Sequence, residues 1–378
     1  MTANRRDFLR YSAAVGALGF LGGAVPALAA RGKETGSGGN GRRLLILGGT
    51  AFLGPQIVEA ARVLGYAITL FNRGKTHPEL FPDLEKLRGD RDGNLKALEG
   101  RTWDVVVDTS GYVPRHVRDS VALLRDAVKQ YIFISTISVY SDNSKAGMDE
   151  SSPVGKLPDE TTEKVTGETY GPLKALCEQA AQKAAPGKVT VIRPGLIVGP
   201  GDGTDRFTYW PVRVERGGEV LAPGTPADPI QFIDVRDLAE WTMRVARDGV
   251  LGVFNATGPK KELGIGKLLD TCKSVSGSDA SFTWVDAPFL EEQKVGAWSD
   301  MPVWVPPTGE TAGFARVSRS KAVARGLTFR SLAATVQDTL SWWKSQPKER
   351  QATLRAGIKP EREAEVLKAW RERKPAAR

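Results

Sequence analysis

A tyrosine and a lysine four residues apart form the most informative pair for chemistry in this 378-residue chain. Tyr170 and Lys174 stand in the run YGPLK, which continues into a helix-forming segment. Four residues is about one helical turn, so the spacing places both side chains on one helix face. A phenol, whose pKa is ordinarily about 10, becomes a usable base at neutral pH when a cation lies nearby. The pair therefore predicts proton transfer to or from a hydroxyl group.

Two upstream segments supply what such chemistry needs. The apolar run Tyr131–Ser135 predicts a buried strand, and the hydroxyl of Thr136 at its end is expected to hydrogen-bond the substrate oxygen. Nearer the N-terminus, the apolar strand Arg43–Leu47 leads directly into GGTAFLG and then a helical pattern. A strand, a glycine turn and a helix N-terminus together favour binding of a dinucleotide pyrophosphate. The predicted cofactor contacts in this loop are Gly48, Thr50, Ala51, Phe52, Leu53 and Gly54.

The end of the second predicted strand, Ala67–Phe71, indicates which dinucleotide is bound. The sequence there is Asn72-Arg73-Gly74-Lys75, with no acid to bond a ribose 2′-hydroxyl. Arg73 is placed to meet a 2′-phosphate, which favours NADP over NAD. Further cofactor contacts are expected beyond the later strands, where open α/β sheets bind ligands. These contacts are Lys75, Asp90, Thr109, Ser110 and Gly111.

The order of apolar runs and helical patterns predicts an α/β fold. We expect a Rossmann-type, doubly wound parallel sheet over residues 42–195, including the helix that carries Tyr170. Residues 196–343, richer in glycine, proline and aromatic residues, predict a smaller C-terminal substrate-binding lobe with elements that return to the first domain. The closing helix is expected to begin near Asp338.

Five motifs in the same order resemble those of the extended short-chain dehydrogenase/reductase family, the NAD(P)-dependent epimerases and dehydratases. They are GGTAFLG (48–54), FISTISVY (133–140), YGPLK (170–174), RPGLIVGPGD (193–202) and FIDVRDLA (232–239). The resemblance implies that Thr136, Tyr170 and Lys174 form a catalytic triad, and that Pro194 and Ile197 lie along the nicotinamide. The combination of GGTxFLG with FNRG resembles a branch that contains isoflavone-reductase-like proteins and chloroplast RNA-binding proteins. A homodimer formed through the Tyr170 helix is common in proteins of this kind.

Candidate substrate contacts lie mostly in the second half of the chain. Gln231 stands where sugar-nucleotide enzymes often place an arginine, which argues against a diphosphate substrate. The run WSDMPVWVPPTGE (298–310) is expected to be a loop that closes over the substrate. The predicted substrate contacts are Tyr112, Tyr209, Arg213 and Gln231.

The N-terminus predicts an export signal. Arg5 and Arg6 precede Asp-Phe-Leu, an apolar run follows, and Ala27-Leu28-Ala29 supplies small residues at a cleavage site. The segment resembles a twin-arginine signal over residues 1–29, followed by a flexible linker over residues 30–41. We therefore expect a periplasmic or otherwise exported protein with no stable membrane insertion after signal removal.

The formal net charge of +9 is concentrated at the chain ends. Residues 344–378 alone contain eleven Lys and Arg against five Glu, which predicts a basic tail that is either an exposed helix or only partly ordered. The nearly neutral remainder argues against a nucleic-acid partner. Two cysteines and two histidines argue against a disulfide scaffold and against a metal site.

Three functions remain open on the sequence. The first is an exported oxidoreductase or epimerase that works on a sugar-like secondary alcohol with tightly bound cofactor. The second is an NADPH-dependent reductase of an enone or carbonyl substrate, and dehydratase chemistry is not separated from either. The third, of another class, is a non-catalytic nucleotide- or RNA-binding protein with the same fold.

Overall fold

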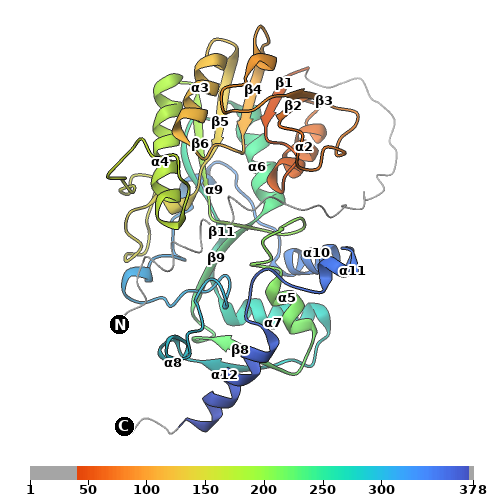
Figure 1. The fold of residues 1–378 in the computed structure, drawn as a ribbon, viewed down its shortest axis with the longest axis vertical. Helices are drawn as coiled ribbons and strands as arrows, with labels where there is room; N and C mark the ends of the chain where they lie inside the picture. The colour runs from red at the N-terminus through yellow and green to blue at the C-terminus, as the bar shows by residue number, and fades with distance from the viewer. Residues whose placement is uncertain (1–40, 374–378) are drawn as a thin grey trace.

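Seven strands form one parallel sheet in a computed structural model that describes residues 41–373 (Figure 1). The strand order is β10-β6-β5-β4-β1-β2-β3, and every neighbouring pair is parallel. Central strands such as β1 and β4 are covered on both faces and are therefore mostly apolar, whereas the edge strand β3 is not. The strands are β1 (Arg43–Leu47), β2 (Ala67–Asn72), β3 (Glu85–Arg88), β4 (Trp103–Asp108), β5 (Val128–Ile134), β6 (Val189–Pro194) and β10 (Gly252–Ala256).

Helices cover both faces of this sheet, as the doubly wound fold requires. Alternate side chains of β1 show the two layers: Leu44 and Ile46 pack toward α2 and α6, whereas Leu45 and Leu47 pack toward α3 and α4. The prediction of a doubly wound α/β fold is therefore confirmed. The helical elements of this body are α2 (Leu53–Val63), η1 (Lys96–Leu98), α3 (Pro114–Leu124), η2 (Ile137–Val139), α4 (Gly167–Ala184), α6 (Val235–Asp248) and α9 (Ser320–Ala324).

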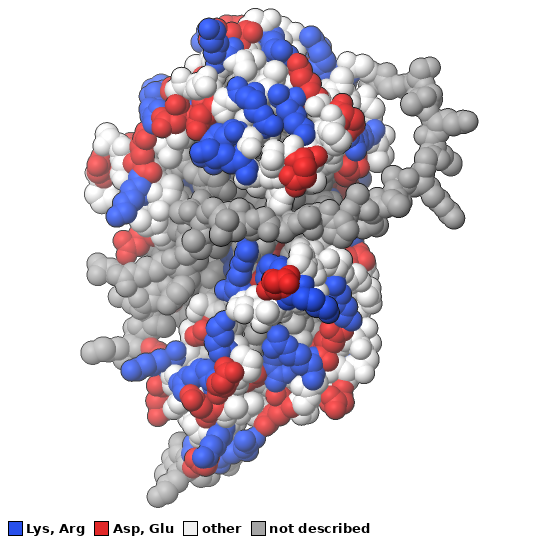
Figure 2. Space-filling model, turned by 45° about the vertical axis from the view of Figure 1, so that its right-hand side comes forward, with Lys and Arg blue, Asp and Glu red and all other residues white. Residues whose placement is uncertain are grey.

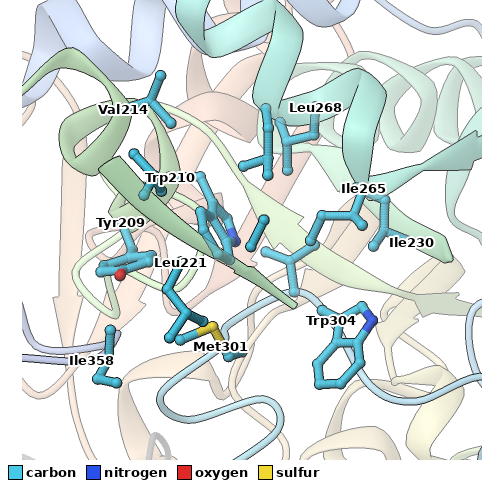
Figure 3. Packing of buried hydrophobic residues seen from close by; sticks show 14 of the residues in the cluster. Tyr209, Trp210, Val214, Leu221, Ile230, Ile265, Leu268, Met301, Trp304 and Ile358 are labelled. Carbon is cyan, nitrogen blue, oxygen red and sulfur yellow. The ribbon is translucent and has the colours of Figure 1, made fainter. Parts of the chain in front are cut away.

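The smaller lobe lies below the sheet in Figure 1 and has its own apolar core. Trp210, Met301 and Trp304 fill the centre of this core, packed by residues of α5, β8 and α7 (Figure 3). Its strands form a three-stranded sheet, β7 (Leu196–Val198), β9 (Pro229–Asp234) and β11 (Gly258–Gly264), and a pair, β8 (Glu219–Pro223) and β12 (Ser281–Val285). Its helices are α5 (Tyr209–Glu215), α7 (Ile265–Ser276), α8 (Ala287–Glu292), η3 (Gly309–Thr311), α10 (Leu332–Lys344), α11 (Lys348–Gln351) and α12 (Pro360–Glu372).

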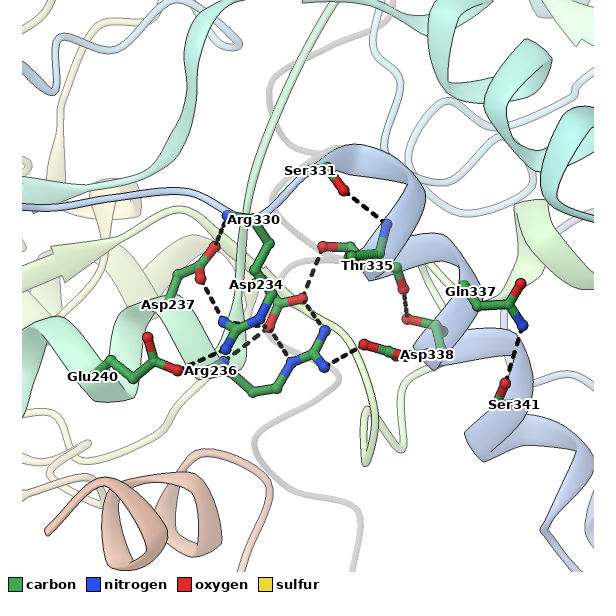
Figure 4. Close-up of polar contacts among 12 residues, drawn as sticks. Asp234, Arg236, Asp237, Glu240, Arg330, Ser331, Thr335, Gln337, Asp338 and Ser341 are labelled. Carbon is green, nitrogen blue, oxygen red and sulfur yellow. Dashed lines mark hydrogen bonds and ion pairs between the residues drawn. The ribbon is translucent and has the colours of Figure 1, made fainter. Parts of the chain in front are cut away.

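An ion-pair cluster joins the start of α6 to the C-terminal part of the chain (Figure 4). Asp234 caps α6 through the backbone N–H of Arg236 and also accepts hydrogen bonds from the side chains of Arg236 and Thr335. Arg330 pairs with Asp237 and Glu240 on α6. These contacts fix α10 against the strand–helix junction of the body, so lobe and body share a charged, partly buried seam.

Of the two forms expected for the basic tail, the structure shows the helical one, but α12 is not fully exposed. Val366 and Leu367 of α12 are buried in the lobe core, and Glu363 forms a buried ion pair with Arg213. Several basic residues of this segment have acidic partners in the lobe: Lys344 pairs with Glu215, Arg350 with Asp205, Arg371 with Glu219 and Arg373 with Asp286. The apolar face of α12 therefore packs into the lobe, although most residues of this helix are charged.

The start of the closing helix also differs from expectation. The closing helix begins at Leu332, where the Ser331 side chain accepts a hydrogen bond from the backbone N–H of Ala334. The predicted signal (1–29) and all but Gly41 of the predicted linker lie outside the described residues. Between residues 41 and 373, no helix is both long and apolar enough to cross a membrane.

Candidate active site

The glycine loop after β1 is shaped so tightly that only glycine fits at its key positions. Gly48 has a φ of 116°, and a Cβ there would lie 2.3 Å from Oγ1 of Thr109. A Cβ on Gly54 would lie 2.5 Å from the carbonyl carbon of Gly49, because the first turn of α2 rests on the loop. The N-terminus of α2 has no side-chain cap and no acid in its first turn. Its free N–H groups can therefore face an anion such as a pyrophosphate.

The ends of β2 and β3 form a cationic corner beside this loop. Asn72 Oδ1 accepts hydrogen bonds from Gly74 N and from the guanidinium of Arg88, while Asn72 Nδ2 is buried without a partner among the described residues. Arg73 and Lys75 are exposed. Asp90 is engaged in a turn, where its carboxylate accepts from Asp92 N. The corner thus offers guanidinium and N–H donors, and residues 72–75 contain no acid.

Residues at the end of β4 connect the glycine loop to the lysine. The hydroxyls of Thr109 and Ser110 both donate to the carbonyl of Leu47, at distances of 3.0 and 3.2 Å. The next carbonyl, that of Gly111, accepts a hydrogen bond from Lys174. The residues that follow β4 therefore contact both the glycine loop and α4 at the carboxyl edge of the sheet.

The side chain of Lys174 is buried and is held by two backbone carbonyl groups. Its Nζ donates to the carbonyls of Gly111 and Ile134, both at 2.7 Å, and the residue is only 3% exposed. The ammonium also lies 4.2 Å from the ring centroid of Phe133 and 5.4 Å from that of Tyr112. Two of its three N–H groups are thus used by the protein, and the third remains for a ligand.

Burial lowers the pKa of Lys174 to about 8, an effect that nearby Cys177, Asp108 and Glu178 oppose. The unfolded chain, with a lysine pKa near 10.5, binds more protons than the folded chain above about pH 8. We therefore expect wild-type stability to rise relative to that of Lys174→Met by about 2 kcal/mol between about pH 7 and about pH 10. Urea unfolding of both proteins at the two pH values measures this difference. A difference that stays constant or falls with pH contradicts the expected shift.

Tyr170 lies one helical turn before Lys174, with its ring 6.4 Å from that of Tyr112. Burial raises the pKa of its phenol above the ordinary value, and the Thr136 hydroxyl and the Arg206 guanidinium act in the opposite direction. Thr136 is held in place by Ser138, whose backbone N–H donates to Oγ1 at 3.1 Å. The structure therefore brings Thr136, Tyr170 and Lys174 together at the ends of β4 and β5.

Gly171, which was not among the predicted site residues, allows α4 to pack closely against η2. A Cβ at Gly171 would lie 2.0 Å from the carbonyl oxygen of Ser138, so α4 packs directly on η2. We expect Gly171→Ala to lower turnover by about 100-fold, because Tyr170 would shift relative to Thr136. The measurement is kcat, with Gln179→Ala on the exposed face of α4 as the control. Alanine has a higher helix propensity than glycine, so the substitution does not weaken α4 itself. Full activity in Gly171→Ala would therefore show that the close contact between α4 and Ser138 is not needed.

Comparison with known proteins shows the family to which the chain belongs. The model of the NAD dependent epimerase/dehydratase family matches residues 44–256, more than half of the chain. The chain belongs to this family. The match takes in the glycine loop, the Tyr170 helix and β10, and its members' description as NAD dependent agrees with a nicotinamide cofactor at the glycine loop.

Individual relatives of the family are distant. A chloroplast stem-loop binding protein of 41 kDa from Arabidopsis thaliana is 26% identical over 250 residues, which cover 58% of this chain and 59% of that protein. UDP-glucuronic acid 4-epimerase from Bacillus cereus, solved with NAD, has a TM-score of 0.57 at 15% identity and covers 79% of this chain and 96% of its own. Human epimerase family protein SDR39U1, solved with NADPH, has a TM-score of 0.53 at 20% identity, with coverage of 79% and 99%. The structural likeness shows a shared fold.

Three of the predicted substrate contacts are not free to serve as such, which corrects the sequence interpretation. Arg213 is engaged by Glu363 and by the carbonyls of Gly217 and Glu219. Tyr209 is buried in the lobe core, where its ring contacts Trp210. Gln231 is buried and exchanges two hydrogen bonds with the backbone of Val317.

Other predicted residues lie at the cleft edge of the sheet. Tyr112 is 37% exposed beside Tyr170 and Lys174. Pro194 ends β6 and Ile197 lies in β7; between them, a Cβ on Gly195 would lie 3.6 Å from Ile137 of η2. This segment therefore passes close to the element that carries Thr136. The Trp- and Pro-rich segment is not an open loop, because Trp298, Met301 and Trp304 are buried.

Two functional candidates were not among the predicted contacts. Arg88 is brought to Asn72 by the pairing of β3 with β2. Arg206 lies between the GPGD motif and α5, and its charge acts on Tyr170. Arg88 stands two residues before the predicted contact Asp90, and Arg206 stands three residues before the predicted contact Tyr209, so local sequence marks both neighbourhoods without marking the arginines themselves.

Proposed function

We propose that the protein is an exported NADP-dependent oxidoreductase or epimerase that acts on a secondary alcohol or carbonyl carbon of a sugar-like substrate. The observation that carries the proposal is Lys174, fixed on the carbonyls of Gly111 and Ile134 with one N–H still available, one helical turn after Tyr170. A surface pair at this spacing would have no reason to be buried at the carboxyl edge of a parallel sheet.

The residues present fit a bound NADP. The glycine loop and the uncapped N-terminus of α2 would hold the pyrophosphate, since Gly48 and Gly54 allow the loop to fold closely against Thr109 and the first turn of α2, whose N–H groups have no side-chain cap. Asn72, Arg73 and Arg88 would hold the 2′-phosphate, and Lys174 would hold the nicotinamide ribose. The bound cofactor supplies the acceptor and donor of a hydride. The preference for NADP is part of the proposal.

The chain's own residues manage the proton. The Thr136 hydroxyl hydrogen-bonds the substrate oxygen, and Tyr170, as the phenolate, takes the proton from that oxygen as an alcohol is oxidised. In the reverse direction Tyr170 returns the proton to the oxygen. Since burial raises the pKa of the phenol, positive charge is needed beside it, and Lys174 and Arg206 are the cations in position.

Export motivates a tightly held cofactor. NADP is not replenished outside the cytoplasm, so a useful enzyme there keeps its cofactor and runs a redox-neutral cycle. Epimerisation, in which one substrate is oxidised and re-reduced, meets that condition. Reduction of a carbonyl or enone with external NADPH is the alternative, and it predicts loosely bound cofactor.

Nucleic-acid binding is the alternative of another class, and the Arabidopsis relative is named for stem-loop binding. On the face shown in Figure 2, however, Lys and Arg side chains alternate with Asp and Glu, without a continuous basic stripe. Nucleic-acid binding normally requires such a stripe. The charge pattern of this face therefore favours the small-molecule proposal.

The proposal is tested by the small molecule that copurifies with the mature protein. We expect absorbance and mass spectra to show one tightly held nicotinamide dinucleotide, and added secondary alcohols of the sugar class to reduce it. Protein that carries no nicotinamide and binds NADP only weakly would contradict the proposal. Tight binding of a stem-loop RNA without cofactor would favour the alternative.

The cofactor preference gives a separate prediction. We expect Arg73→Ala and Arg88→Ala each to weaken NADP binding about tenfold or more and to leave NAD binding nearly unchanged, because each removes a charge-assisted hydrogen bond to the 2′-phosphate. Calorimetric titration with both dinucleotides measures the ratio. Lys183→Ala, which removes a cation from the far end of α4, is the control. Equal NADP and NAD affinities in the wild type would refute the preference.

A further inference from the structure

Arg206 differs from several other arginines of the described chain because its guanidinium forms no ion pair among the described residues. Arg213, Arg236, Arg330 and Arg350 each form an ion pair within the described chain. The only hydrogen bond of the Arg206 guanidinium among the described residues runs from Nε to Thr204 Oγ1, at 3.2 Å. Both terminal nitrogens are therefore without a partner there.

The surroundings of Arg206 place it at the active site. Its guanidinium lies 5.7 Å from the ring centroid of Trp298, which supports one side of it. The segment that leads to it also contacts the glycine loop, since a Cβ on Gly201 would lie 3.5 Å from the ring of Phe52. Burial lowers the pKa of Arg206, and the charges of Asp202 and Tyr170 oppose that effect. The free donors therefore lie within electrostatic reach of the Tyr170 phenol.

A second polar group beside Arg206 also lacks a partner. Asp202 is 1% exposed, and its Oδ1 accepts from the backbone and hydroxyl of Thr204. Its Oδ2 is buried and has no partner among the described residues. Buried polar groups are almost always hydrogen-bonded, so the buried Asp202 Oδ2 needs a partner. This acceptor and the unpaired terminal nitrogens of the half-buried Arg206 together indicate a site for a polar ligand.

We infer that Arg206 binds a carboxylate of the substrate, so that the substrate is a hydroxy acid. A guanidinium with two free terminal nitrogens matches the two oxygens of one carboxylate. A diphosphate would need more cations, but Gln231 is neutral and bonded to Val317, and Arg213 is occupied by Glu363. Asp202 Oδ2 would accept from a neighbouring substrate hydroxyl. This inference rests on the proposed function, because it names the substrate class of the same site.

Binding measurements test the inference without requiring turnover. The probes are paired acids and neutral alcohols, D-glucuronate with D-glucose and D-gluconate with D-sorbitol, titrated calorimetrically into the NADP-loaded protein. We expect at least one acid to bind about tenfold or more tightly than its neutral partner. Arg206→Gln should reduce this preference to less than about twofold, and Arg206→Lys should retain part of it. Arg216→Gln, which alters an exposed arginine of the same lobe, is the matched control and should retain the full preference.

The outcomes separate this inference from the proposed function. Neutral alcohols that bind as tightly as the acids, acids that do not bind at all, or an acid preference that survives in Arg206→Gln would each overturn the inference. Absorbance of reduced cofactor with the same probes reports the chemistry independently. Acid-selective binding without cofactor reduction would count against the proposed function only, whereas equal oxidation of acids and neutral alcohols would count against the carboxylate site only. Thermal melting of each variant confirms that it is folded.

Discussion

Tyr170→Phe is expected to lower turnover by about 1,000-fold while leaving NADP affinity unchanged. The phenol oxygen is the group that would exchange a proton with the substrate, and general acid–base catalysis contributes rate factors of this order. The ring of phenylalanine preserves the packing against Tyr112. Cofactor contacts come from the glycine loop, the β2 corner and Lys174, none of which the substitution touches. Comparison of kcat with the dissociation constant for NADP measures the two effects separately.

A matched tyrosine provides the control for this substitution. Tyr66 is buried beside α2, and its hydroxyl has no hydrogen-bond partner among the described residues. Tyr66→Phe removes the same atom from a place outside the site, so turnover should be retained. Turnover that persists in Tyr170→Phe would mean that another group moves the proton. A protein with no turnover in either form, but with unchanged ligand binding, would fit a binding module.

Sequence reasoning reached the body of the fold because its signals are local. The run Arg43–Leu47 is apolar throughout, as a strand buried on both faces must be, and the glycines that follow it are required by the turn itself. Tyr170 and Lys174 are linked by helical periodicity alone. These features are encoded within a few residues, so no knowledge of distant contacts was needed.

The residues that were missed depend on contacts between distant segments. Arg206 forms no ion pair among the described residues. Arg213, in contrast, is paired with Glu363, which lies 150 residues further along the chain. Both arginines precede or lie in the same short helix, so periodicity treats them alike. Gly171 likewise matters through Ser138, on an element that the sequence does not place. Partner identity, which decides whether a charge is free, is a property of the tertiary structure.

Glu178 of α4 is the centre of a buried polar cluster. It lies one turn after Lys174, accepts two-pronged hydrogen bonds from Arg193, and accepts a short hydrogen bond from Ser135 Oγ. Arg193 also donates to the hydroxyl of Tyr140. Since Ser135 directly precedes Thr136, the cluster joins the end of β5, the helix α4 and β6 at the point where the candidate triad meets.

We expect Glu178→Leu to lower the free energy of unfolding by about 3–5 kcal/mol, because Arg193 would remain buried without a countercharge. The double variant Glu178→Leu with Arg193→Met removes both charges and should recover much of that loss, since an apolar pair of similar volume avoids an isolated buried charge. Urea unfolding of the wild type, both single variants and the double variant completes the cycle. A single variant that loses less than about 1 kcal/mol would show that water reaches Arg193. Recovered stability without recovered turnover in the double variant would show that the ion pair's function is to position Thr136 rather than to hold the fold together.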